Sequence, residues 1–159
     1  MNKRYSIFAF FTLILLLGIT VYAYANRIEG NPNGRYRVLI ATESTAYKNQ
    51  MVDTLISKLS DGNVRITVVD HMRGGLDAMD PRDFNAVFIT NSGAQAMVRP
   101  VVMNWLNRVR DFDDNVILHT TQINNWTPPV QVDSVTSASN RRNISDLTDD
   151  LVDRIRAFF

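Results

Sequence analysis

Apolar and polar positions divide the chain into one long leading apolar run and a longer region of short alternating runs. The leading run covers Ile7 to Ala25, IFAFFTLILLLGITVYAYA, and no charged side chain lies between Arg4 and Arg27. As a helix, a run of this length would span roughly 28 Å at about 1.5 Å per residue, close to the ~30 Å hydrocarbon thickness of a bilayer. It also lacks the polar stripe of a soluble helix. Residues 1–26 are therefore predicted to be an N-terminal membrane anchor or signal segment.

Two fates of this segment are consistent with its flanks. Basic residues precede it, and Ala23-Tyr24-Ala25 has the small-x-small pattern of a signal-peptidase site. The apolar run is longer than the usual core of a signal peptide, which favours an uncleaved anchor. We expect a single-pass membrane protein with residues 7–25 in the lipid bilayer and its domain on the extracytoplasmic side. The alternative is secretion after signal cleavage. Residues 27–35, rich in glycine and asparagine, are predicted to be a linker.

Strand-like and helix-like patterns alternate from residue 36 to residue 159. Short apolar runs predict strands at 38–41, 64–69, 86–89, 116–119 and 132–135. Three amphipathic stripes predict helices over 51–59, 98–109 and 144–158, since their apolar residues recur at spacings of three and four. Continuous apolar strands between amphipathic helices indicate an α/β domain with a mostly parallel sheet covered on both faces.

This order, from RVLIATESTAYKNQMVDTLISKL to VDSVTSASNRRNISDLTDDLVDRI, resembles the flavodoxin-like fold. The resemblance is greatest to membrane-anchored flavodoxin-like proteins of unestablished role. It implies a three-layer domain over 36–159 with five parallel strands in the order 2-1-3-4-5. Ligands of such a sheet bind at the carboxyl ends of the strands, where the order reverses. The cofactor that the resemblance implies is FMN.

The loop after the first strand of the domain is the candidate phosphate loop. Thr42, Ser44 and Thr45 supply hydroxyls there, but the loop has no glycine and Glu43 places a negative charge beside the expected phosphate. The remaining candidates are Asn91 and Ser92 after the third strand, and Trp126 as a platform for the flavin ring. In the competing interpretation the hydroxyls cap the following helix and Trp126 packs over the strand ends. The pattern favours a degenerate site with no cofactor, and FMN is the alternative.

Other chemistry has little support in the sequence. The two histidines, His71 and His119, should end strands separated by two others, about 14 Å apart at the usual strand spacing, so no metal site is expected. The chain has no cysteine and no nucleophile elbow, Walker loop or zinc-protease motif. Catalytic residues remain unassigned, and the protein is predicted to be no enzyme.

Net charge and loop lengths bear on partners. The formal net charge is +1, so no basic surplus points to nucleic acid. The connections at 70–85 and 121–131 are too short for full helices, which predicts one thinly covered sheet face open to a protein partner or a homodimer. The alternative is that both loops fold over that face. The sequence thus favours a non-catalytic binding or assembly module; the alternative is a membrane-tethered FMN-binding electron-transfer protein.

Overall fold

The computed structural model describes residues 26–93, 97–122 and 126–159. The predicted membrane segment at 7–25 lies outside these ranges. Within them, no helix combines the length and the apolar character needed to cross a membrane.

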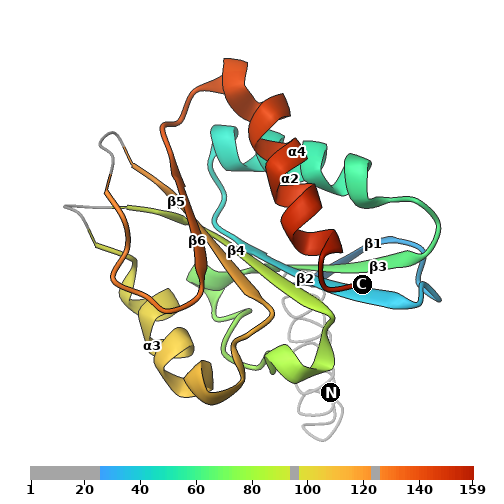
Figure 1. Cartoon of the computed structure of the whole chain (residues 1–159), viewed down its shortest axis with the longest axis horizontal. Coiled ribbons are helices and arrows are strands. Elements are labelled where there is room, and N and C mark those ends of the chain that lie inside the picture. Colours follow the sequence, from blue (N-terminus) through green and yellow to red (C-terminus); the bar gives the residue numbers. More distant parts are fainter. Residues whose placement is uncertain (1–25, 94–96, 123–125) are drawn as a thin grey trace, which may run out of the picture.

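One six-stranded sheet forms the centre of the domain (Figure 1), with the spatial order β1-β3-β2-β4-β5-β6. Its strands are β1 (Asn26–Gly30), β2 (Tyr36–Thr42), β3 (Val64–Asp70), β4 (Ala86–Ser92), β5 (Val116–Thr121) and β6 (Asp133–Ser137). Strands β2 to β6 are mutually parallel, and β1 is antiparallel to β3. The predicted α/β class with a mostly parallel sheet is confirmed, and the five predicted strands keep their expected relative order. The predicted strand count was wrong, because β1 adds a sixth strand and begins the order.

Strand β1 takes the last residue of the predicted segment 1–26 and the first four residues of the predicted linker 27–35. Its sequence, NRIEG, has no apolar alternation, and Ile28 is half exposed. It pairs in register with β3, from Asn26 opposite Val69 to Gly30 opposite Arg65. Pairing satisfies backbone groups that the edge of β3 would otherwise expose, and this driving force leaves no hydrophobic pattern in the sequence. Gly30 ends the strand with φ 70°, where a Cβ would meet the Val64 carbonyl oxygen at 2.5 Å.

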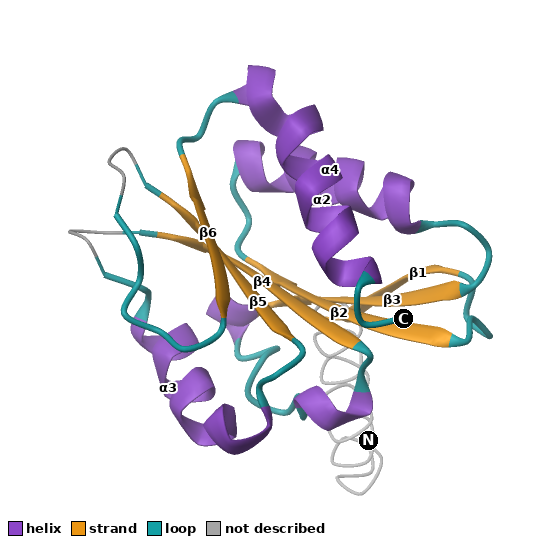
Figure 2. Ribbon diagram, in the orientation of Figure 1, coloured by secondary structure: helices purple, strands orange, loops and turns teal. Residues whose placement is uncertain are grey.

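Three helices cover the sheet: α2 (Ala46–Leu59) and α4 (Ile144–Arg156) on one face, and α3 (Pro100–Val109) on the other. Figure 2 shows α2 and α4 side by side. Their inner side chains bury the strand residues of that face, including Val38, Ile40 and Phe88. Helix α2 begins where Thr45 accepts a hydrogen bond from the Lys48 backbone amide at 3.2 Å, an ordinary N-cap.

Loops complete the cover of the α3 face. Strand residues there, such as Val87, Ile89 and Leu118, are fully buried, with Leu76, Met79, Phe84 and Trp126 packed among them. The 71–85 loop is fastened by the Trp105 indole N–H, which donates to the Met79 carbonyl at 3.0 Å. The expectation of a thinly covered face was therefore wrong: apolar loop side chains take the place of the missing helices. The prediction of a protein partner or a homodimer at that face depended on the missing cover.

Candidate functional site

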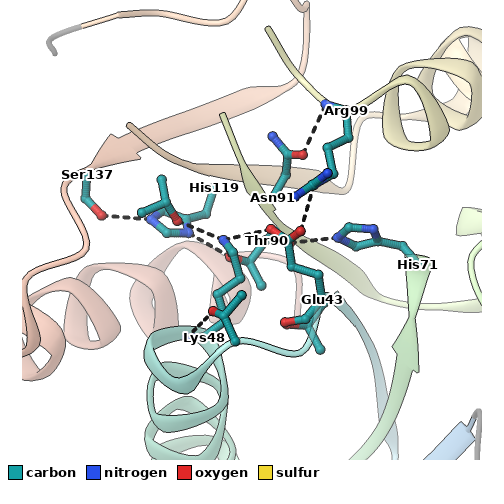
Figure 3. Close-up of polar contacts among 11 residues, drawn as sticks. Glu43, Lys48, His71, Thr90, Asn91, Arg99, His119 and Ser137 are labelled. Carbon is teal, nitrogen blue, oxygen red and sulfur yellow. Dashed lines mark hydrogen bonds and ion pairs between the residues drawn. The ribbon is translucent and has the colours of Figure 1, made fainter. Parts of the chain in front are cut away.

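Polar side chains are buried together at the carboxyl ends of the parallel strands (Figure 3). We call them the strand-end cluster; its buried members are Glu43, Lys48, His71, Thr90, Asn91, His119, Thr120 and Thr121. They come from the ends of β3, β4 and β5, from the loop after β2 and from the first turn of α2. Because β3 and β4 flank β2, this is the point at which the strand order reverses, where open α/β sheets bind their ligands.

Lys48 lies at the centre of the cluster, with 1% of its side chain exposed. Its ammonium donates to the hydroxyls of Thr90 at 3.0 Å and Thr121 at 2.8 Å. The third partner is Glu43, whose Oε1 lies 3.7 Å from Nζ. Burial lowers the pKa of Lys48 to about 8, although the charge of Glu43 opposes this shift. The ammonium therefore loses its proton far more readily than an exposed lysine does.

Glu43 joins Lys48 to Arg99, at the start of α3. Its Oε2 lies 2.7 Å from Arg99 Nε. Burial by itself would raise the pKa of the carboxyl, but the Ser92 hydroxyl and the charges of Lys48 and Arg99 outweigh it, so the pKa is lowered. Glu43 is thus a carboxylate between two cations, and these three residues carry one net positive charge.

Both histidines contact Thr90. The Nε2 of His71 donates to the Thr90 carbonyl at 3.0 Å, because a carbonyl can only accept; the free acceptor of the neutral ring is then Nδ1. His119 lies between two hydroxyls, with Nδ1 2.9 Å from Thr90 Oγ1 and Nε2 2.8 Å from Ser137 Oγ. Burial lowers the pKa of both imidazoles, that of His119 to about 3. Both rings are neutral at physiological pH.

Several buried polar atoms of the cluster have no hydrogen-bond partner among the described residues. They are Glu43 Oε1, His71 Nδ1, Asn91 Nδ2 and Thr120 Oγ1, together with Arg99 Nε, which is held only by its ion pair. Leaving a buried polar group unsatisfied costs about 1–3 kcal/mol, so such groups mark a place where water or a ligand completes the site. The unmatched atoms here include both donors and acceptors.

The nearest approach to a catalytic arrangement is the Ser137–His119 pair. Its hydrogen-bond distance suits a nucleophile and a base. The imidazole, however, is oriented by the Thr90 hydroxyl and not by a carboxylate, and the nearby charge of Lys48 adds to burial in keeping its pKa near 3. A base that weak does not activate a serine at neutral pH. Lys48 itself is buried, and its ammonium is directed at protein partners, so it offers no reactive group to a substrate.

The structure places the predicted site residues in several different roles. Asn91 belongs to the cluster, where its Oδ1 accepts from the Arg99 backbone amide at 3.1 Å, and Ser92 contacts Glu43. Thr45 caps α2. Thr42 and Ser44 line a separate cleft of about 430 Å³ between α2 and β1–β3.

Trp126 lies apart from the other predicted residues. It is half-buried and packs against the apolar side chains on the α3 face of the sheet. This placement matches the competing interpretation, in which the ring packs over strands.

FMN fits the phosphate end of this site poorly. A phosphate group needs converging donors and a loop that can approach it closely. Here Thr45 is used as a helix cap, Thr42 donates to the Glu43 carbonyl at 3.2 Å, and the Glu43 carboxylate lies inside the loop. The loops that would hold the flavin ring include residues 94–96 and 123–125, which are outside the described ranges. Within the described part of the chain, no group of histidine and acidic side chains is arranged to hold a metal ion.

Sequence reasoning missed the central residue of the cluster. Lys48 continues the apolar stripe of α2, whose buried members are Met51, Val52, Leu55, Ile56 and Leu59. A lysine on the buried stripe of a helix is a signal in itself, because an unpaired charge is not tolerated there. The histidines were named, but Thr90, which bridges them, was not.

Comparison with known proteins confirms the fold. No protein-family model matches the sequence, and no curated protein matches it. A flavodoxin from the domain Archaea superposes with a TM-score of 0.55 at 10% identity, over 77% of this chain and 98% of its own. The flavodiiron protein from Giardia intestinalis gives 0.50 at 12% identity, over 79% of this chain and 37% of its own. The Flv1 flavodiiron core from Synechocystis sp. PCC6803 superposes with a TM-score of 0.50 at 6% identity, over 80% of this chain and 36% of its own.

The protein therefore has a flavodoxin-like α/β fold with a mostly parallel six-stranded sheet. At these identities the likeness establishes the fold alone. The chain spans little more than a third of the two flavodiiron proteins, so their other parts have no counterpart in it.

Proposed function

We propose that this domain is a non-catalytic binding module that takes a small hydroxylated monoanion, such as a 2-hydroxy acid, at the strand-end cluster. The carrying observation is the set of unpartnered buried atoms at the point where the strand order reverses. Glu43, Lys48 and Arg99 leave one positive charge to be balanced. A carboxylate would accept from Asn91 Nδ2, and a hydroxyl would donate to His71 Nδ1.

Among the described residues of the cluster, the buried histidines and Lys48 favour binding without catalysis. The pKa values of both histidines are lowered by burial, and the ammonium of Lys48 is directed at Thr90, Thr121 and Glu43. A ligand at the cluster would meet hydrogen-bonding groups whose positions are fixed by protein partners, and the ammonium of Lys48 would face those partners and not the ligand.

Calorimetric titration of the protein with glycerate and lactate tests this proposal. We expect both to bind, and inorganic phosphate and FMN to give no heat. Thr120→Val is an isosteric change that removes one of the unpartnered buried hydroxyls of the cluster. We expect binding to weaken about five-fold, which is the worth of one hydrogen bond. Stability should not fall, because the hydroxyl has no hydrogen-bond partner among the described residues. Thr67→Val, in the middle of β3, is the matched control and should bind like the wild type. Absence of glycerate and lactate binding would refute the proposal.

The alternative function is a flavin electron carrier, and the similarity to the archaeal flavodoxin favours it. Titration with FMN separates the two functions: a carrier turns yellow and quenches flavin fluorescence at one equivalent, whereas the binding module leaves free flavin fluorescence unchanged. Saturable FMN binding would replace our first proposal with this one.

We further propose that residues 7–25 anchor the domain to a membrane, with the domain on the extracytoplasmic side. The apolar run supports insertion into the membrane, and the basic residues that precede it, Lys3 and Arg4, support the extracytoplasmic side. The full chain should float with liposomes in a density gradient and resist extraction at alkaline pH. A mature N-terminus at Asn26 in a soluble fraction would instead establish secretion after cleavage.

A further inference from the structure

The chain enters the sheet at its carboxyl-terminal end. Strand β1 begins at Asn26, which pairs with Val69 near the end of β3, and it runs antiparallel toward Gly30 opposite Arg65. The apolar run ends at Ala25, one residue earlier. The end of the predicted membrane segment and the strand-end cluster are therefore at the same end of the domain.

No flexible linker separates the end of the apolar run from the sheet. The first residues after the apolar run are held by the β1–β3 ladder, and Arg27 forms ion pairs with Glu29 at 3.0 Å and Asp53 on α2 at 3.2 Å. An extended residue covers at most about 3.4 Å. A membrane segment ending at Ala25 would hold this end of the sheet at the bilayer surface, whereas a free linker over 27–35 would have let the domain rotate.

On this basis we infer that the carboxyl-terminal end of the sheet faces the bilayer; the inference rests on the proposed anchoring. Exposed side chains at this end suit a lipid surface. Met72, after β3, is 52% exposed and Met97, before α3, is 59% exposed. Arg73 lies beside Met72 and is also exposed, so it can meet headgroup phosphates.

This orientation has a consequence for the strand-end cluster. Glu43, Lys48 and Arg99 lie at the end of the domain that faces the headgroups. A ligand of the cluster would approach along the membrane surface, and anionic headgroups would compete with it for the positive charge of this end.

Single-cysteine labelling of the full chain in liposomes tests the orientation, and the natural chain contains no cysteine to interfere. A fluorophore is attached to Met72→Cys or Met97→Cys, and in a second sample to Asn33→Cys, an exposed position at the amino-terminal end of the sheet. The two ends of a seven-residue strand are about 20 Å apart. We expect a headgroup-borne quencher to quench Met72→Cys and Met97→Cys at least two-fold more strongly than Asn33→Cys.

A chain with a 12-residue Gly-Ser insertion between Ala25 and Asn26 is the matched control. It should float equally well, and its labels at positions 72, 97 and 33 should be quenched to the same extent. Equal or reversed quenching in the floating, uninserted protein would overturn the orientation while leaving the anchor intact. Failure of the full chain to float would overturn both, and neither result depends on glycerate binding.

Discussion

The strand-end cluster and the two ion pairs of Arg154 are groups of opposite charges with very different surroundings. In the cluster, Glu43 and Lys48 are almost completely buried. At the β6 edge of the sheet, Arg154 of α4 bridges Asp133 of β6 at 2.6 Å and Asp150 of α4 at 2.8 Å, with more than a third of each side chain exposed. Both exposed contacts are shorter than the 3.7 Å contact between Glu43 and Lys48, yet we expect the loss of an exposed partner to cost less stability.

The difference shows that burial, and not distance, decides what these charges do. Water screens the charges around Arg154, so each such pair is worth about 0–1 kcal/mol. A buried charge gains little net stability from its partner, but loss of the partner leaves it uncompensated. The cluster is therefore expected to be sensitive to single substitutions and to pH, whereas the ion pairs of Arg154 are expected to tolerate both.

The largest effect is expected from Glu43→Gln. It leaves the buried Lys48 and the partly exposed Arg99 without the carboxylate that they share. We expect a loss of about 3–5 kcal/mol in the free energy of unfolding, measured with urea. Asp149→Asn, which removes the exposed partner of Lys58, is the matched control and should lose less than 1 kcal/mol. Similar losses in both variants would contradict the distinction between the two regions.

The next effect concerns acid stability and His119. Its pKa is lowered from 6.5 to about 3 on folding, so between these values the unfolded chain holds a proton that the folded chain does not. The free energy of unfolding must therefore fall as pH falls from 6.5 to 3, with a contribution of about 1.4 kcal/mol per pH unit from this group. In His119→Gln this contribution disappears. Parallel pH profiles for wild type and variant would show that the ring is not buried in its neutral form.

Lys48 should make the free energy of unfolding depend on pH in the alkaline range. With its pKa at about 8 in the folded chain and near 10.5 in the unfolded one, the unfolded state holds the extra proton between these values. The free energy of unfolding should therefore rise with pH in this window, by up to about 1.4 kcal/mol per pH unit. Lys48→Met should lack the rise. The comparison uses urea titrations of both proteins at pH 7.5, 9 and 10, and the interpretation fails if the variant rises as steeply.

The smallest effect is expected from Arg154→Gln. It removes the ion pair with Asp133 of β6 and the ion pair with Asp150 of α4. Solvent can hydrate the aspartates that remain, so we expect a loss of less than about 1 kcal/mol at low salt. In 1 M NaCl, which screens the pairs in the wild type, the difference should nearly vanish. A loss comparable to that of Glu43→Gln would show that exposure is a poor guide to these energies.

The patterning of the sequence predicted the repeating part of the fold. Apolar runs such as Val38–Ala41 became buried strands, and the stripe from Met51 to Leu59 became the inner face of α2. These elements are decided locally, because burial of one face imposes a period on the chain. Strand β1 was not predictable in this way, since it is held by backbone pairing to β3.

The candidate site was predictable only in part. Asn91 and Ser92 were placed at the correct end of the sheet, because parallel strands share their carboxyl ends. Thr45 caps α2 and Trp126 packs against the α3 face, and their side-chain types alone did not reveal these contacts. Lys48 was missed although its position on an apolar stripe was visible, because its partners Thr90 and Thr121 are 42 and 73 residues away in the chain.

By itself, then, the sequence determined the α/β alternation, the leading apolar segment and the end of the sheet at which polar residues would gather. Only the tertiary structure decided that the connections at 70–85 and 126–131 cover the α3 face, that β1 begins beside the carboxyl end of β3, and that Glu43 turns inward between Lys48 and Arg99. The first group follows from periodicity and chain length. The second depends on which distant backbone and side-chain groups satisfy one another once water is excluded.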